Sequence, residues 1–322
     1  MLTTEKIDTG NKPLVRRFIA LPYRLYAGHR QWVPPLLGDM ELMLNRSKHP
    51  FYQHSDADFF LATRDGCDVG RIAALENKRY NDYHKTRQAQ FYLFDCENDP
   101  EAVAALFEQV FAWARARGLT RLVGPKGFGP LDGYGLLVEG FEHRQLMTMM
   151  NYNYDYYPKL VAALGFEKEV DFVSCYLGRD AFRLPERVHR IADRVQERGL
   201  LRVRRFAGKR ELVAWAGRIG QAYNKAFVNN WEYYPLTEAE VKFVVDNIML
   251  VADHRLIKII THGDDAVGFL FAFPDVSAAL QRARGRLFPL GLPDLLLDMR
   301  RTQWVALIGA GILPEFQGHG GN

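Results

Sequence analysis

The C-terminal residues 312–322 hold the residue pattern with the clearest chemical use. An apolar run over residues 304–312 leads through Pro314-Glu315-Phe316 into Gln-Gly-His-Gly-Gly-Asn. Glycines let a backbone take positive φ and approach a ligand closely, and successive free N–H groups at the start of a helix attract an anion. The pattern therefore predicts a strand followed by a diphosphate-binding loop. The alternative is a flexible glycine-rich tail.

Two carboxylates are candidates for a general base, which must reach the proton that it removes directly or through one water. The predicted strand over residues 303–312 carries no carboxylate. Glu232 lies in a predicted loop between two helices, and Asp275 follows a predicted hairpin. A surface or capping role is the commoner use of carboxylates at such positions and stays open as the alternative.

Composition and cysteine usage exclude several classes of protein. The three cysteines, Cys67, Cys96 and Cys175, are far apart and match neither a metal-ligand spacing nor a disulfide framework, which favours a reducing cytoplasm. No apolar run reaches the roughly 18 residues of a membrane span. The net charge of +4 is too mild to indicate nucleic acid. We expect a cytoplasmic protein with no metal and no membrane partner.

Two predicted hairpins share one plan. The first joins strands over residues 58–63 and 69–75, and the second joins strands over residues 256–261 and 266–273. Each reads strand, turn with glycine, Val-Gly, strand, which is a hairpin signature. Their separation is too long for a solenoid repeat and predicts two copies of one domain in tandem.

The first copy continues with a strand over residues 90–95 and a helix that starts at Asn98-Asp99-Pro100, where a capping residue precedes a proline. A short strand over residues 120–123, a helix over 156–164 and a closing strand over 172–177 follow. Residues 124–155 are rich in Gly, Met and Tyr, and connections of this length are usually functional or disordered. Their aromatic content argues against disorder.

A linker helix and the second copy complete the chain. The helix over residues 182–199 places Arg187, Arg190, Arg194 and Arg198 on one stripe; a solvated face is the simplest interpretation, and a contact with an acidic partner or RNA is the alternative. Helices over residues 211–227 and from the Thr237–Glu240 capping box precede the second hairpin. The predicted domains are residues 1–180, a linker at 181–199, and residues 200–322.

The C-terminal loop resembles the acyl-CoA loop of the GNAT superfamily, whose signature is Gln/Arg-x-x-Gly-x-Gly/Ala. Gln317, Gly320 and Asn322 occupy the defined positions, and Asn322 departs from the small residue expected last. The whole chain resembles a tandem GNAT protein of bacterial type. Segments that recur in that subgroup lie at residues 94–100, 124–125, 135–141, 156–157 and 165–166. The resemblance implies an α/β fold in which each copy is a mostly antiparallel, mixed α+β sheet flanked by helices.

The resemblance also implies an activity, which is direct acyl transfer from an acyl-CoA, first of all acetyl-CoA, to the amine of a small molecule or peptide. The backbone of Gly311, Ile312 and Leu313 would bind the pantetheine and polarise the acyl carbonyl. The diphosphate would contact loop residues Gln317, Gly318, His319, Gly320, Gly321 and Asn322. Glu232 or Asp275 would be the base, and no metal takes part.

The first copy departs from this pattern. Its corresponding loop reads Cys-Glu-Asn-Asp-Pro-Glu-Ala over residues 96–102, without glycine. Because Glu97, Asp99 and Glu101 would repel a diphosphate, we expect a degenerate half that binds no cofactor. The second copy stops before the elements that follow the loop in a GNAT domain. We expect a truncated copy with weak acyl-CoA binding; completion by another chain, as in a homodimer, is the alternative.

Two further functions stay open. A Fem-like aminoacyltransferase that uses aminoacyl-tRNA would fit the arginine stripe, but it has no need of a diphosphate loop. A non-catalytic scaffold built from two decayed acyltransferase domains would fit the acidic loop of the first copy and the absence of an obvious base.

Overall fold

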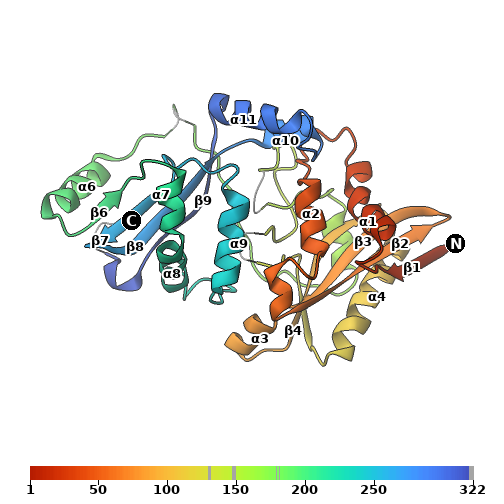
Figure 1. Cartoon of the computed structure of the whole chain (residues 1–322). Helices are drawn as coiled ribbons and strands as arrows, with labels where there is room; N and C mark the ends of the chain where they lie inside the picture. Colours follow the sequence, from red (N-terminus) through yellow and green to blue (C-terminus); the bar gives the residue numbers. More distant parts are fainter. Residues whose placement is uncertain (130–131, 147–149, 179, 181, 319–322) are drawn as a thin grey trace. The chain divides into compact units, whose positions relative to one another are not determined.

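The computed structural model describes residues 1–322 except 130, 131, 147–149, 179, 181 and 319–322 (Figure 1). The chain forms two compact units. Unit 1 comprises Met1–Glu169 and Asp275–Thr302, and unit 2 comprises Val170–Pro274 and Gln303–Asn322. The expected division placed all of residues 200–322 in the second copy, whereas the structure packs Asp275–Thr302 with unit 1.

Unit 1 is built on a five-stranded sheet in the order β1-β2-β3-β4-β5. Its strands are β1 (Leu2–Lys6), β2 (Asp56–Arg64), β3 (Cys67–Glu76), β4 (Gln88–Cys96) and β5 (Arg121–Val123). All neighbours pair antiparallel except β5, which is parallel to β4. Asp65 and Gly66 join β2 to β3 with φ of 50° and 85°, the type I′ geometry that suits a twisted hairpin. The first predicted hairpin is confirmed.

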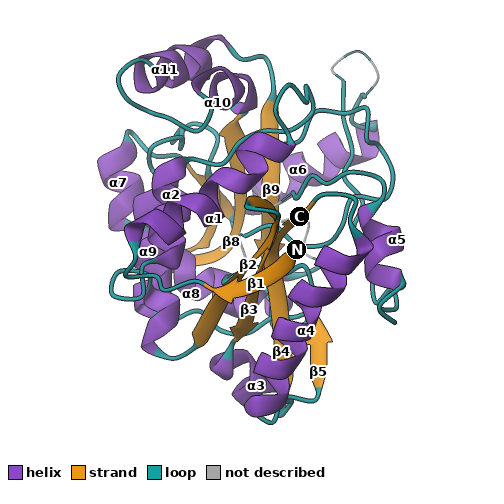
Figure 2. Ribbon diagram, turned by 90° about the vertical axis from the view of Figure 1, so that its right-hand side faces the viewer, coloured by secondary structure: helices purple, strands orange, loops and turns teal. Residues whose placement is uncertain are grey.

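Hydrophobic layers cover both faces of this sheet. On one face, Phe60 and Ile72 pack with Phe107 of α4 (Pro100–Ala116), which lies across the strands in Figure 2. On the other face, Phe59 and Leu61 pack with α1 (Lys12–Leu25) and α2 (Leu37–Leu44). Because neighbouring residues of a strand point to opposite faces, burial of both faces makes the strands nearly continuous apolar runs. The unit also contains η1 (Pro50–Gln53), α3 (Lys78–His84) and α5 (Tyr157–Ala162).

Unit 2 has a four-stranded antiparallel sheet in the order β6-β7-β8-β9. The strands are β6 (Arg202–Arg204), β7 (Lys258–His262), β8 (Asp265–Pro274) and β9 (Val305–Ile312). Its helices are α6 (Glu186–Arg198), α7 (Lys209–Ala214), α8 (Ala216–Ala226), α9 (Glu238–Ile248) and η2 (Pro314–Phe316). The second hairpin, β9 and the Thr237–Glu240 capping box at the start of α9 are confirmed.

Two predicted elements of unit 2 are wrong. The helix expected over residues 211–227 is divided into α7 and α8 at Trp215, whose N–H bonds back to the carbonyls that close α7. Residues 172–177 form no strand, because no strand in the described part of the chain pairs with them. Phe172 and Tyr176 instead make edge-to-face ring contacts with Trp231 and Trp304 at 5.3 and 6.1 Å.

The connection between β8 and β9 packs with unit 1. It holds α10 (Ser277–Ala283) and α11 (Gly291–Arg301), which lie beside each other in Figures 1 and 2. The Gln281 amide donates to the carbonyl oxygens of Arg30 and Trp32 at 2.7 and 2.9 Å. The Leu37 N–H donates to the Gly285 carbonyl at 2.9 Å. These partners are close in space but remote in sequence, so local patterns did not indicate them.

The two hairpins share a bulge at the valine of their Val-Gly pair. Val69 and Val267 are each the extra residue where the strand register shifts. The glycine that follows is required sterically: a Cβ on Gly70 would come within 2.8 Å of a thiol sulfur on β4, and one on Gly268 within 3.0 Å of a backbone carbonyl on β9. The shared bulge therefore sets which residues of the two units correspond.

Candidate functional site

β9 is the last strand of its sheet in the described part of the chain, so one of its edges pairs with no described strand; we call it the open edge, and Ile312 at its end is 6% exposed. The Leu313 N–H donates to the Val267 carbonyl at 2.8 Å. In an antiparallel pair, alternate residues bond to the neighbouring strand, so Gly311 also faces β8. Ala310 and Ile312 direct their N–H and C=O groups away from it. Of the three residues predicted to bind the pantetheine, Ile312 is the one whose N–H lies on the open edge.

Gly311 of β9 makes room for an aromatic ring. Gly311 lies opposite Phe269, and Gly309 lies opposite Phe271. A Cβ on Gly311 would come within 2.8 Å of the Phe269 ring and 3.3 Å of the Ala226 Cβ at the end of α8. The two phenylalanine rings stack at 4.5 Å. Gly311 therefore serves packing, and it lets the end of α8 come close to the end of β9.

The turn after β9 is η2 followed by Gln317 and Gly318. The Phe316 N–H donates to the Leu313 carbonyl at 2.9 Å, and the Phe316 ring packs 5.2 Å from the His262 ring. Gly318 has φ of 77°, the left-handed conformation that favours glycine. The Gln317 side-chain amide lies 3.4 Å from the Ile312 carbonyl, on the open edge. The other predicted loop residues, His319, Gly320, Gly321 and Asn322, lie outside the described residues.

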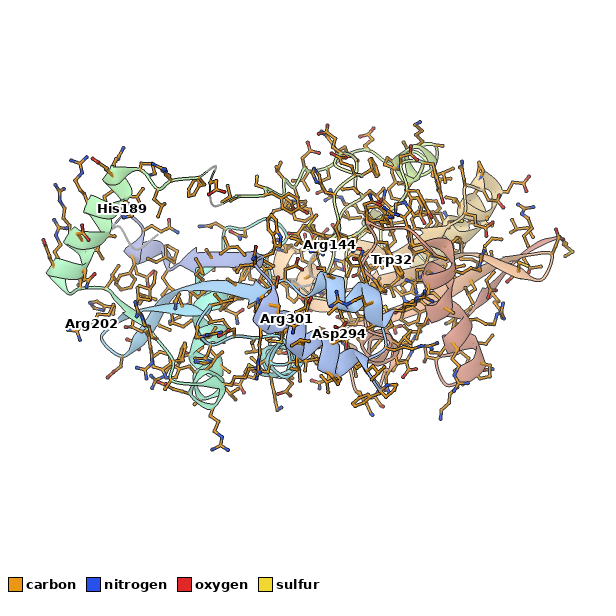
Figure 3. All side chains as sticks on the ribbon, turned by 90° about the horizontal axis from the view of Figure 1, so that it is seen from above. Trp32, Arg144, His189, Arg202, Asp294 and Arg301 are labelled. Atoms are coloured by element: carbon orange, nitrogen blue, oxygen red, sulfur yellow. The ribbon has the colours of Figure 1, made fainter. Side chains whose placement is uncertain are left out.

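The carboxylate of Asp275, one predicted base, bonds to two other side chains and a backbone N–H. The residue is 4% exposed. One carboxylate oxygen pairs with the Arg144 guanidinium, and the other accepts from the Ser277 N–H at 2.9 Å and hydroxyl at 2.5 Å; Arg144 is labelled in Figure 3. Asp275 follows Pro274, which lies about 20 Å along β8 from Gly268 and hence far from the strand end that pairs with Ile312.

Glu232, the other predicted base, lies on a loop that starts beside β9. The loop leaves α8 just after Ala226, the residue that packs against the end of β9. Asn224 holds the loop: its amide bonds to both backbone groups of Leu236 at 2.9 and 3.0 Å, and its carbonyl accepts from the Tyr233 hydroxyl at 2.5 Å. Glu232 has φ of 57° and is half-buried. The fixed ends of the loop restrict where this carboxylate can lie.

The corresponding strand end in unit 1 is closed. The Glu97 N–H donates to the Val69 carbonyl at 2.9 Å, as Leu313 does at the equivalent valine of unit 2, so Cys96 corresponds to Ile312. The outward Cys96 N–H donates to the Tyr157 hydroxyl at 2.8 Å, and the Tyr156 hydroxyl donates to the Cys96 carbonyl at 2.8 Å. Two tyrosines thus bond the backbone groups of Cys96, whereas at Ile312 the carbonyl accepts from the Gln317 side chain and the N–H points to the open edge.

The carboxylates of the acidic turn that follows Cys96 also have partners within the protein. Asp99 accepts from two backbone N–H groups at the start of α4 and pairs with Arg64 at 2.7 Å, which confirms its predicted capping role. Arg64 also pairs with Glu101, and Arg24 pairs with Glu97, both at 2.9 Å. The carboxylates expected to repel a diphosphate therefore neutralise arginines and start the helix.

Two titratable residues of the long loop in unit 1 escaped the sequence analysis. Burial lowers the pKa of Lys126 to about 7, and its ammonium nitrogen lies 4.6 Å from the centre of the Tyr80 ring. Burial also raises the pKa of Asp132 to about 6, although the Gly129 N–H donates to its carboxylate at 2.8 Å. A Cβ on Gly127 would come within 2.1 Å of the Asp132 Cβ. In the sequence, only the glycine content and the length of residues 124–155 indicated that this loop deserved study.

Three other expectations concern the arginine stripe, metal ions and membrane spans. The arginine stripe lies on α6, a helix without a buried residue. Within the residues that the structure describes, no three His, Cys, Asp or Glu side chains form a group that could hold a metal ion. Over the same residues, none of the helices combines the length and the apolar character needed to traverse a bilayer.

Comparison with known proteins adds named relatives. No family model matches the sequence. The chain is 32% identical over 308 residues, 94% of its length, to 79% of the bacterial ceramide synthase of Caulobacter vibrioides (strain NA1000 / CB15N). It is 26% identical over 314 residues, 95% of its length, to 78% of protein YghO of Escherichia coli (strain K12).

Among solved structures, a tandem GNAT protein from the clavulanic acid biosynthesis pathway aligns with 99% of this chain and 81% of its own, at 12% identity and a TM-score of 0.49. An aminoglycoside acetyltransferase from an uncultured soil metagenomic sample aligns with 55% of this chain and 97% of its own, at 12% identity and a TM-score of 0.35. On the identity and coverage of the Caulobacter relative, the chain belongs to the family of the bacterial ceramide synthase.

Proposed function

We propose that this protein is an N-acyltransferase that moves an acyl group from the sulfur of an acyl-CoA to the nitrogen of an amine. The observation that carries the proposal is the outward N–H of Ile312 on the open edge of β9, directly before the turn that contains Gly318. A fixed backbone donor at such a position stabilises the oxygen of a thioester carbonyl as negative charge develops on it.

The reaction needs few groups from the protein. The amine nitrogen attacks the thioester carbonyl carbon, a C–N bond forms and the C–S bond breaks. The amine gives its proton to a base, and CoA leaves as a thiolate that is protonated from solvent. We assign the base to Glu232, because its loop starts beside the end of β9, whereas Asp275 follows the other end of β8, which pairs with Val305. The assignment makes unit 2 the catalytic copy.

The name of the Caulobacter relative supports a class of acceptor. A ceramide is the amide of a long-chain amino alcohol with a fatty acid, so its synthesis acylates a lipid amine. We therefore propose a long-chain amino alcohol as acceptor and a long-chain acyl-CoA, rather than acetyl-CoA, as donor. The exposed free thiols of Cys67 and Cys175 are compatible with the reducing compartment in which acyl-CoA is available, and we place the reaction in the cytoplasm.

An assay of the purified chain tests the proposal. Sphinganine, a long-chain amino alcohol, is incubated with acetyl-, octanoyl- or palmitoyl-CoA; free CoA thiol and the amide product, the latter by mass spectrometry, are both measured. We expect amide and thiol in equal amounts, most of all with palmitoyl-CoA. Amide formation from aminoacyl-tRNA alone would favour the Fem-like function, and no product with any donor would favour the scaffold.

Matched proline substitutions test the observation itself. Ile312→Pro removes the outward N–H but none that bonds to β8, and proline is tolerated on such a strand edge. Loss of one such donor typically lowers turnover by about 10²–10³-fold. Ala310→Pro removes the neighbouring outward N–H and is the control, expected within a few-fold of the native chain; Ile312→Ala controls for the lost side chain. Equal turnover in both proline variants would refute the role of Ile312.

A further inference from the structure

The turn between α10 and α11 presents apolar side chains to solvent. Phe288 is 78% exposed and Leu290 is 76% exposed, and Pro289 between them is exposed as well. Isolated apolar residues are common on protein surfaces, but adjacent ones form a patch that usually marks an interaction site. We call residues 288–290 the apolar tip.

The apolar tip is held outward by the backbone beneath it. The Gly285 carbonyl accepts from the Leu37 N–H at 2.9 Å, and the Leu292 N–H donates to the Leu287 carbonyl at 2.6 Å. Gly285 has φ of 73°, and a Cβ there would come within 2.5 Å of a backbone carbonyl underneath. The segment is therefore fixed on both sides of the tip, and its packing leaves the apolar side chains outside.

Arginines lie directly before the apolar tip and, roughly 15 Å along α11 from it, at the end of that helix. Its segment has four exposed arginines that form no ion pair within the described part of the chain: Arg284, Arg286, Arg300 and Arg301. The nearby carboxylates of Asp294 and Asp298 are both paired with Arg282, at 2.8 and 3.1 Å. Asp294 and Arg301 are labelled on α11 in Figure 3. The segment therefore combines a protruding apolar turn with basic side chains that lack an internal counter-charge.

We propose that this segment docks on the surface of an anionic lipid bilayer, with the apolar tip entering the headgroup region and the arginines contacting lipid phosphates. Apolar side chains with adjacent Lys or Arg are the combination that binds in the interface plane, and each basic residue strengthens attraction to anionic lipids. Such a tip is far too short to be detected by a search for membrane spans, which is why the sequence indicated no membrane partner. The docking does not depend on the proposed acyl transfer.

Co-sedimentation of the full chain with vesicles tests this inference without substrate. Vesicles of phosphatidylcholine are compared with vesicles that also contain phosphatidylglycerol. We expect binding to the anionic vesicles, weakened by salt, and a loss of about tenfold or more in Phe288→Ser/Leu290→Ser and in Arg284→Gln/Arg286→Gln. These side chains are exposed, so the variants should unfold at the same temperature as the native chain.

Two controls keep the outcome specific. Val138→Ser removes another exposed apolar side chain of unit 1, and Arg187→Gln/Arg190→Gln removes the same charge from α6; both should bind vesicles as the native chain does. Equal loss in the α6 variant, or undiminished binding in the tip variant, would overturn the inference. So would a concentration-dependent dimer that disappears in the tip variant, since the patch would then be covered by a second copy.

Discussion

The ends of β4 in unit 1 and β9 in unit 2 are the same structural position with opposite outcomes. Each strand follows a hairpin that contains a bulged valine, Val69 or Val267. The residue directly after each strand, Glu97 or Leu313, donates its N–H to the carbonyl of that valine. In unit 1 the outward groups of Cys96 are bonded by the hydroxyls of Tyr156 and Tyr157. In unit 2 the outward N–H of Ile312 is at the edge of the sheet.

This contrast shows how the backbone groups at one strand end can be satisfied internally while the surrounding scaffold is kept. Unmet backbone groups must find a partner when they are buried, and in unit 1 that partner is the protein's own α5. The acidic turn follows the same rule, because Asp99 caps α4 and pairs with Arg64. The two units therefore differ in what satisfies one strand end, and the differences can be tested one group at a time.

The largest expected effect separates the two candidate bases. Glu232→Gln should lower kcat by about 10²–10⁴-fold, since a general base typically contributes that much. Asp275→Asn should instead lower the melting temperature, because it weakens the pair with Arg144, and should leave the shape of the pH–rate profile unchanged. The reverse pattern, measured by steady-state kinetics and thermal denaturation, would place the chemistry at Asp275.

A smaller effect is expected from opening the closed edge of unit 1. Tyr157→Phe leaves the buried Cys96 N–H without its partner and should lower the free energy of unfolding by about 1–3 kcal/mol. Turnover at 25 °C should not change. Phe94→Leu, which alters the same aromatic cluster but no hydrogen bond, controls for packing. New acyl-CoA binding by calorimetry in the tyrosine variant that persists in an Ile312→Pro background would contradict the assignment of unit 2 as the catalytic copy.

The smallest effect concerns a titratable group found in unit 1. Because burial raises the pKa of Asp132 to about 6 from its ordinary value of 3.8, the folded chain binds a proton more tightly than the unfolded chain. Stability from this group is therefore fully present below pH ~4 and is lost as pH rises through ~6. Asp132→Asn should remove this pH-dependent decrease in the free energy of unfolding, which is up to about 3 kcal/mol in the native chain. Denaturant melts of both proteins across this pH range check it; parallel curves would show that the shift is absent.

Much of the local structure follows from the sequence, because its determinants lie within a few residues. The Asp65-Gly66 turn, the Asp99-Pro100 start of α4 and the Thr237–Glu240 capping box each depend on neighbouring groups. Strand pairing is different. Residues 172–177 have an apolar strand-like composition, but a strand needs a partner, and the described residues provide none.

The candidate site was only partly predictable for the same reason. The order of strand, turn and glycine marks the end of β9, but the choice of Ile312 over Gly311 and Leu313 depends on the pairing register with β8. The use of Gly311 to admit the Phe269 ring is likewise a cross-strand property. Nothing near Asp275 in sequence indicates Arg144, which holds its carboxylate in the folded chain.

The placement of Asp275–Thr302 with unit 1 has a consequence for the order of assembly. The chain passes between the units after Glu169, after Pro274 and after Thr302, so neither unit is a continuous stretch of sequence. During synthesis, Arg30 and Trp32 must wait for Gln281, a separation of about 250 residues, and β9 reaches β8 only later. Such non-local contacts form slowly. A cut at residue 170 would thus release a piece that lacks Asp275–Thr302, a part of its own fold.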